Sequence, residues 1–113
     1  LQKIFYGDPR VLPTWKVLVM ATIDGARALG MDDCLGSLEV GKRADLILID
    51  VKKPHVIPMQ NPCASLVYSV RGSDVDTTIV DGRILMENRK VQTLDGDKVM
   101  EKGRQAASDL SSR

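Results

Sequence analysis

His55 is the only histidine in the chain, and Cys34 and Cys63 are the only soft donors that could join it around a metal ion. Hydrolytic metal centres generally require several histidine or carboxylate ligands. Neither an H-x-H nor a C-x-x-C spacing occurs in the sequence. We therefore predict no metal site within the chain, and we interpret His55 as a surface or interface histidine in a proline-rich stretch at residues 54–58.

The two cysteines are also weak candidates for nucleophiles, because a reactive thiolate needs a neighbouring base. The sequence supplies none beside Cys34 or Cys63, so we expect both to pack as small apolar side chains. Gly36, Gly41 and Gly82 do not have the spacing of a phosphate-binding loop, and we interpret them as turn residues.

Six aspartates lie at boundaries between predicted elements. At such boundaries a carboxylate commonly caps a helix or closes a turn by accepting hydrogen bonds from backbone N–H groups. We predict this structural role for all six: Asp24, Asp45, Asp50, Asp74, Asp76 and Asp81. The residues alone thus predict no catalytic, cofactor-binding or metal-binding side chain in this chain.

The composition excludes several classes of partner. Sixteen Lys and Arg against fifteen Asp and Glu leave a net charge of +1 in 113 residues, and aromatics make up 4%. There is accordingly no basic surface for nucleic acid or an anionic membrane, and no stacking platform for bases. No apolar run approaches the roughly 20 residues that span a bilayer, and no signal peptide opens the chain. We expect a cytoplasmic location.

Two predicted elements are too apolar to be self-sufficient. Residues 13–30 predict one helix that is apolar on most of its sides, beginning near Pro13 and ending at Gly30. Residues 46–49 are four consecutive apolar residues, which indicates a strand covered on both faces. Leu38 and Val40 alternate as strand-like positions between these two elements. A chain of this length has little room to bury all of this surface, so we expect covering layers from elsewhere.

The remaining elements follow from local signals. Asp81-Gly82 between two β-branched runs predicts a hairpin with a type I′ turn. Asn61-Pro62 predicts the start of a short helix, and Asp95-Gly96-Asp97 that of a last one. The corresponding segments are residues 1–6 (the end of a helix), 63–70 (helix), 76–80 and 83–87 (strands) and 97–110 (helix).

The segments ATIDGARALG at residues 21–30 and GSLEVGKRADLILID at residues 36–50 resemble the C-terminal region of the amidohydrolase superfamily. LVYS (66–69), GSDV (72–75) and VDG (80–82) narrow the resemblance to the methylthioadenosine/S-adenosylhomocysteine deaminase and chlorohydrolase-like branch. The resemblance covers essentially the whole chain.

In that family a metal-bearing (β/α)8 barrel accompanies a small β-sandwich built from both chain ends. The resemblance therefore implies an α+β fold, namely the C-terminal share of the sandwich with flanking helices, without the barrel. Residues 1–30 would be helices that follow the last barrel strand, residues 31–94 the sandwich portion and residues 95–113 the C-terminal helix. The family's H-x-H pair, its two later histidines and its aspartate all belong to the barrel, and none matches a residue here.

The implied function is that of a non-catalytic C-terminal portion of a metal-dependent amidohydrolase. The parent enzyme would hydrolyse a C–N or C–Cl bond of a purine- or triazine-like ring with a divalent metal, zinc or iron, while this chain would be inactive alone and hold no cofactor. Its partner would be the missing barrel portion or a second copy. Two alternatives stay open: a self-associating structural or interaction module that docks through residues 14–29, and a dimeric enzyme with its site at the interface.

Overall fold

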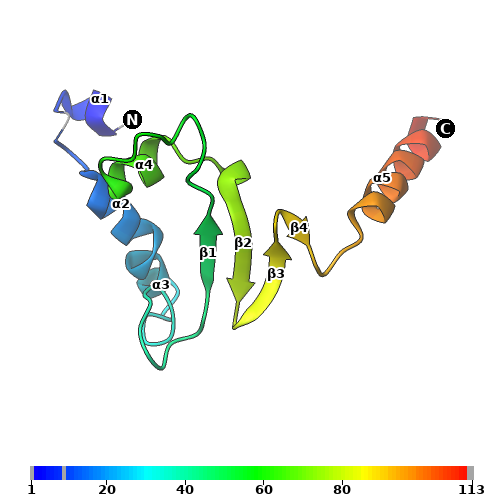
Figure 1. Cartoon of the computed structure of the whole chain (residues 1–113), viewed down its shortest axis with the longest axis horizontal. Helices are drawn as coiled ribbons and strands as arrows, with labels where there is room; N and C mark the ends of the chain where they lie inside the picture. The colour runs from blue at the N-terminus through cyan, green and yellow to red at the C-terminus, as the bar shows by residue number, and fades with distance from the viewer. Residues whose placement is uncertain (1, 9, 112–113) are drawn as a thin grey trace.

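The computed structural model describes residues 2–8 and 10–111, which form one antiparallel sheet with helices on both of its flanks (Figure 1). The described strands lie in the order β1-β2-β3-β4: β1 (Leu46–Ile49), β2 (Val75–Val80), β3 (Arg83–Glu87) and β4 (Lys90–Val91). The helices are α1 (Gln2–Tyr6), α2 (Thr14–Ala21), α3 (Ile23–Ala28), α4 (Pro62–Tyr68) and α5 (Gly96–Ser111), with a 3-10 turn at Gly72–Asp74. The predicted α+β class with an antiparallel sheet is confirmed.

The predicted hairpin is present between β2 and β3. Asp81 and Gly82 both have positive φ, at 50° and 75°, as a type I′ turn requires. The Oδ1 atom of Asp45 accepts a hydrogen bond from the Asp81 N–H at 2.6 Å. The turn is thereby tied to the residue that precedes β1, which keeps β1 in register along β2.

The predicted starts of α4 and α5 are confirmed as well. Asn61 Oδ1 accepts a hydrogen bond from the Ala64 N–H at 3.1 Å, and Asp95 Oδ1 accepts one from the Lys98 N–H at 3.2 Å. Each satisfies a backbone donor that the first helical turn leaves without a partner.

The prediction of one helix over residues 13–30 was wrong, because the helix is interrupted at Thr22. Thr22 has φ −121° and ψ −97°, outside the helical region, and its hydroxyl donates to the Leu18 carbonyl at 2.7 Å. Such a side-chain hydrogen bond to the preceding turn competes with the helical ladder. The result is two short helices, α2 and α3, and α3 is followed by Gly30 at φ 66°.

Leu38 and Val40 do not form a strand. Gly36 and Gly41 bound the segment with φ of 86° and 93°, and the Lys42 ammonium donates to the Asp32 carbonyl and the Ser37 hydroxyl, each at 2.7 Å. These bonds fold the segment into a loop. The loop exposes Leu38 and Val40 in place of pairing them.

Little of the described surface is buried within the chain. Ala26 and Val56 are the buried apolar residues, and Ile47 and Leu48 of β1 are 52% and 53% exposed. Successive strand residues point to opposite faces, so both faces of β1 lack cover. The described residues expose 9053 Å², whereas a compact monomer of this mass exposes about 6,100 Å². The radius of gyration is 18.8 Å, against about 13 Å for a compact chain of this length.

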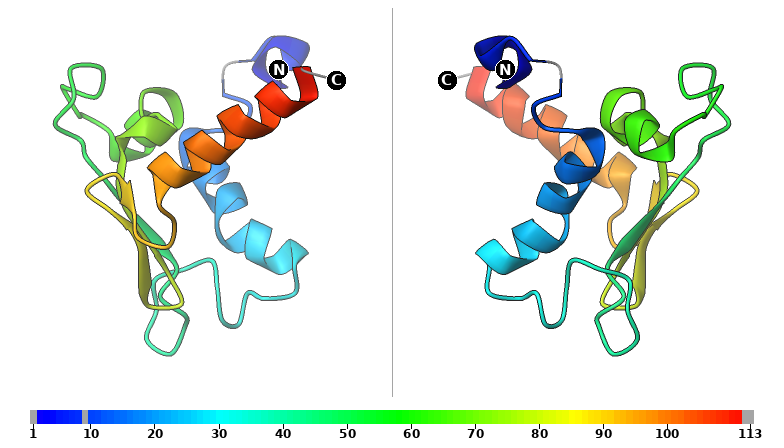
Figure 2. Two further views of the ribbon diagram at one scale, coloured as in Figure 1. Left: turned by 90° about the vertical axis from the view of Figure 1, so that its right-hand side faces the viewer. Right: turned by 90° about the vertical axis from the view of Figure 1, so that its left-hand side faces the viewer.

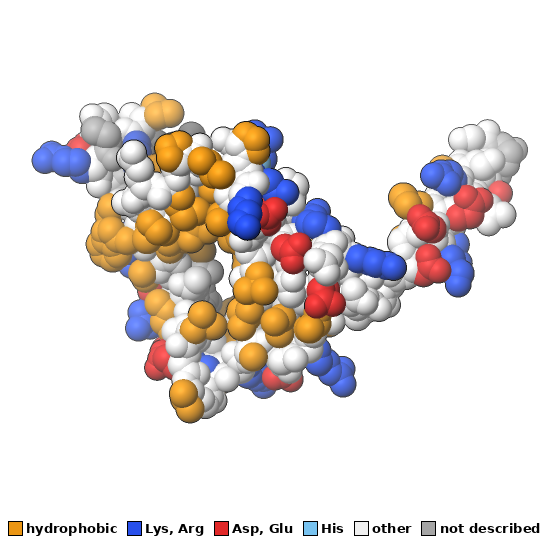
Figure 3. Space-filling model, viewed as in Figure 1, with side chains coloured by type: hydrophobic (Ala, Val, Ile, Leu, Met, Phe, Trp, Pro, Cys, Tyr) orange, Lys and Arg blue, Asp and Glu red, His pale blue; other side chains and the backbone are white. Residues whose placement is uncertain are grey.

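The arrangement of the helices explains this open shape. In both views of Figure 2, α2, α3 and α5 lie on the same side of the sheet. Figure 1 places α2 and α3 beyond the β1 edge and α5 beyond the β4 edge. Two separate arms thus extend from the sheet: α2 with α3 forms the first arm, and α5 forms the second. Figure 3 is viewed as Figure 1. It shows apolar side chains gathered on this face of the molecule, over the sheet and the helices beside its β1 edge.

Gly36 is the glycine whose replacement tests the packing of the loop against α3. A Cβ there would lie 2.8 Å from both the Ala26 Cβ and the Ile23 Cα, whereas a Cβ at Gly41, which also has positive φ, would meet nothing within 4 Å. We expect Gly36→Ala to destabilise the fold by about 2 to 4 kcal/mol, from backbone strain and overpacking together. Gly41→Ala carries the backbone strain alone and should cost about 1 kcal/mol.

Denaturant unfolding monitored by circular dichroism would compare the two variants. Equal losses of stability would contradict the close approach of the loop to α3.

Candidate functional site

His55 and Asp74 form a close contact between two ionisable side chains that lie 19 positions apart in the sequence. His55 Nε2 lies 2.7 Å from Asp74 Oδ2, and the same oxygen accepts a hydrogen bond from the Arg71 N–H at 2.8 Å. The Asp74 side chain is only 4% exposed, while that of His55 is 30% exposed. A buried carboxylate therefore holds one edge of a partly exposed imidazole.

Three segments of the chain meet at this pair. Asp74 ends the 3-10 turn before β2, and its carbonyl accepts a hydrogen bond from the Asp50 N–H at 2.8 Å, just after β1. His55 belongs to the loop that follows β1, and its neighbour Val56 is buried. The pair thus closes the loop over the end of the sheet.

The pair also determines the charge state of the carboxylate. The hydrogen bond from His55 lowers the pKa of Asp74 below its usual value, and the Arg71 N–H contributes in the same direction against the effect of burial. Because the ionised carboxylate can only accept, the imidazole donates through Nε2. Such an arrangement orients a histidine, as in catalytic dyads, but the described contacts bring neither Cys34 nor Cys63 to it.

The cysteines occupy separate places. The Cys34 thiol donates to the Met31 carbonyl at 3.5 Å, and burial raises its pKa, which disfavours the nucleophilic thiolate. Cys63 is half-buried in the first turn of α4. The positions are those of packing residues.

Of the six aspartates, three others serve as turns or ties between adjacent segments, as predicted. Asp45 accepts from the Asp81 N–H, and Asp50 accepts from the Lys52 N–H at 3.0 Å and pairs with the Lys53 ammonium at 2.9 Å. Asp81 itself occupies the hairpin turn.

Asp24 and Asp76 instead bind side chains. Asp24 pairs with Lys16 at 2.7 Å and Arg27 at 3.0 Å, and the hydrogen bond from Lys16 is the main reason that its pKa is lowered. Asp76 accepts a hydrogen bond from the Thr77 hydroxyl at 2.8 Å. The prediction of capping or turn roles was therefore wrong for these two, because a nearby charged or hydroxyl side-chain donor takes the place of the backbone N–H.

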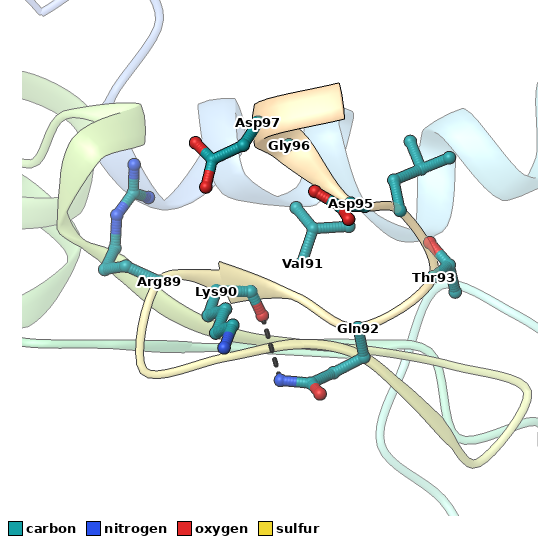
Figure 4. Close-up of a pocket in the computed structure, with 9 residues that line it drawn as sticks. Arg89, Lys90, Val91, Gln92, Thr93, Asp95, Gly96 and Asp97 are labelled. Atoms are coloured by element: carbon teal, nitrogen blue, oxygen red, sulfur yellow. Dashed lines mark hydrogen bonds between the residues drawn. The ribbon is translucent and has the colours of Figure 1, made fainter. Parts of the chain in front are cut away.

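A hollow of about 740 Å³ lies where the chain leaves β4 for α5 (Figure 4). Arg89 at its rim is committed elsewhere, since its Nη1 donates to the Gly72 carbonyl at 3.1 Å and the Val75 carbonyl at 2.8 Å. Gln92 in its wall donates to the Lys90 carbonyl at 3.1 Å. The lining mixes both signs of charge without a convergent set of donors: Arg89, Lys90, Val91, Gln92, Thr93, Leu94, Asp95, Gly96 and Asp97.

A second hollow, of about 450 Å³, lies between α3 and the loop that follows it. Its lining is mainly apolar or small: Ala21, Thr22, Gly25, Ala26, Leu29, Leu35, Gly36, Ser37, Leu38 and Asp45. An apolar groove of this kind is suited to packing against another apolar surface.

Metal binding does not fit the described side chains. Among residues 2–8 and 10–111, no three His, Cys, Asp or Glu side chains come together in a group that could hold a metal ion. The same residues contain no helix long and apolar enough to cross a membrane.

A family model decides the classification of the chain. The model of the amidohydrolase family matches residues 1–85. The chain belongs to this family. A 5-methylthioadenosine/S-adenosylhomocysteine deaminase of Moorella thermoacetica is 54% identical over 99 residues, which make up 88% of this chain and 23% of that enzyme. A 5'-deoxyadenosine deaminase of Methanosarcina acetivorans is 50% identical over all 113 residues, or 26% of its length.

Solved structures of the amidohydrolase family show the same arrangement of elements. An adenosine deaminase from Xanthomonas campestris with bound zinc matches 98% of this chain with a TM-score of 0.90 and 29% identity, over 25% of its own length. A zinc complex of atrazine chlorohydrolase from Arthrobacter aurescens matches 86% of this chain with a TM-score of 0.75 and 26% identity, over 22% of its length. This member of the amidohydrolase family thus spans about a quarter of the length of the curated relatives that it matches.

The His55–Asp74 pair is the feature that the sequence did not reveal. Each residue was assigned a separate role, and 19 positions separate them across a proline-containing loop and α4. The one available signal was the position of Asp74 shortly before the strand predicted at residues 76–80.

The lowered pKa of Asp74 leads to a prediction about stability and pH. A carboxyl group whose folded-state pKa lies below its unfolded value stabilises the fold above the unfolded value, 3.8 for Asp74, and the stabilisation is lost as pH falls through the folded value. We therefore expect Asp74→Asn to lower the unfolding midpoint at pH 6 and to differ less from the unaltered chain near pH 3.

Thermal unfolding of both chains from pH 3 to pH 7 would measure this difference. Asp76→Asn is the matched control, because Asp76 accepts from the neighbouring Thr77 hydroxyl and is not tied to a distant loop. A gap between Asp74→Asn and the unaltered chain that stays constant with pH would contradict the assignment.

Proposed function

We propose that this chain is the non-catalytic C-terminal portion of a metal-dependent deaminase of the amidohydrolase family. In this proposal residues 1–30 follow the last barrel strand, and the sheet is the C-terminal share of a composite β-sandwich whose other strands come from the beginning of the same enzyme. The (β/α)8 barrel of the parent carries the metal, zinc or iron, and all of the catalytic ligands.

The observation that carries the proposal is the match to one quarter of a zinc-containing deaminase, with a TM-score of 0.90 over 98% of this chain. The open shape supports it, because the chain exposes apolar surface on both faces of β1 and along α5. The side-chain inventory supports it too, since the described residues form no group of three metal-binding side chains.

The relatives indicate the parent reaction. Several act, by their names, on methylthioadenosine, S-adenosylhomocysteine or 5'-deoxyadenosine, which share an adenine ring. Hydrolytic deamination of that ring adds water at the carbon that bears the amino group and releases ammonia, leaving a carbonyl. We propose an adenine nucleoside as the substrate of the parent enzyme and the cytoplasm as its location. This chain would contribute stability and shape to the barrel, with no residue in contact with the reacting atoms.

A self-associating interaction module is the second candidate. The observation in its favour is the large exposed apolar set on the helices, including Trp15 at 60%, Met20 at 47% and Leu110 at 73%. Two measurements distinguish this candidate. Light scattering would show a discrete oligomer of the chain, and the DNA upstream of Leu1 would encode no barrel. The deaminase proposal expects an upstream reading frame that encodes an H-x-H pair.

Two assays test the proposal. The chain alone, supplied with zinc and methylthioadenosine, should release no ammonia above background. A chimera in which this chain replaces the matching C-terminal segment of the Moorella thermoacetica deaminase should retain turnover within about tenfold of the parent, because the 54% identity preserves most of the shared packing. Zinc-dependent turnover by the isolated chain, or a well-folded chimera without activity, would contradict the proposal.

A further inference from the structure

We draw no further inference here: the strongest candidate, the His55–Asp74 pair between the loop after β1 and the 3-10 turn, belongs to the site already described, and no third metal-binding side chain joins it among residues 2–8 and 10–111.

Discussion

The constraint behind the whole structure is that this chain cannot bury its own apolar surface. A four-residue strand such as β1 has one set of side chains on each face, and here both sets stay about half exposed, at 52% for Ile47 and 53% for Leu48. Burial of apolar area is the main favourable term in folding, at roughly 25 cal/mol per Å². A chain that leaves so much of it uncovered has its most stable arrangement only when another body supplies the missing layers. The open shape and the separate placement of α2–α3 and α5 support our proposal that the chain is one part of a larger enzyme.

Local polar ties give the open arrangement its definition. Without a large core, the position of each loop depends on bonds that single residues make. Asp74 joins the loop after β1 to the start of β2 through His55, and Arg89 joins the β3–β4 turn to the carbonyls of Gly72 and Val75. Lys42 closes the loop after α3, and Gly36 lets that loop approach the helix. These hydrogen bonds lie within a few residues of the strands or of α3, so they fix the sheet and the α2–α3 arm in place. The described residues of α5 are all exposed.

The parts of the fold that the sequence predicted are those that short-range chemistry determines. The Asp81-Gly82 turn, the Asn61 cap and the Asp95 cap each depend on a few adjacent residues, and each is where the pattern placed it. The missed features depend on competition or on distance. Thr22 breaks a helix through a side-chain hydrogen bond that apolar periodicity does not register, and the glycines around Leu38 and Val40 override their alternation. His55 and Asp74 are brought together by the tertiary arrangement of the loop after β1, α4 and the 3-10 turn, so no spacing in the sequence could have joined them.

The apolar excess of residues 13–30 and 46–49 could nevertheless be identified from the sequence alone. Its significance follows from the way in which surface area scales with the size of a domain. A small domain has a high ratio of surface to volume, so a helix apolar on most sides and a strand apolar on both faces exceed what it can enclose. Two explanations fit such an excess: a larger chain or a partner. The match to a quarter of a zinc-containing deaminase favours the first, because α5 and the α2–α3 pair take the same relative places there as in this chain. If the arms owed their positions to a second copy of this chain, that agreement over 98% of the residues would have no physical cause. This agreement supports our proposal that the apolar surface packs against the rest of a larger enzyme.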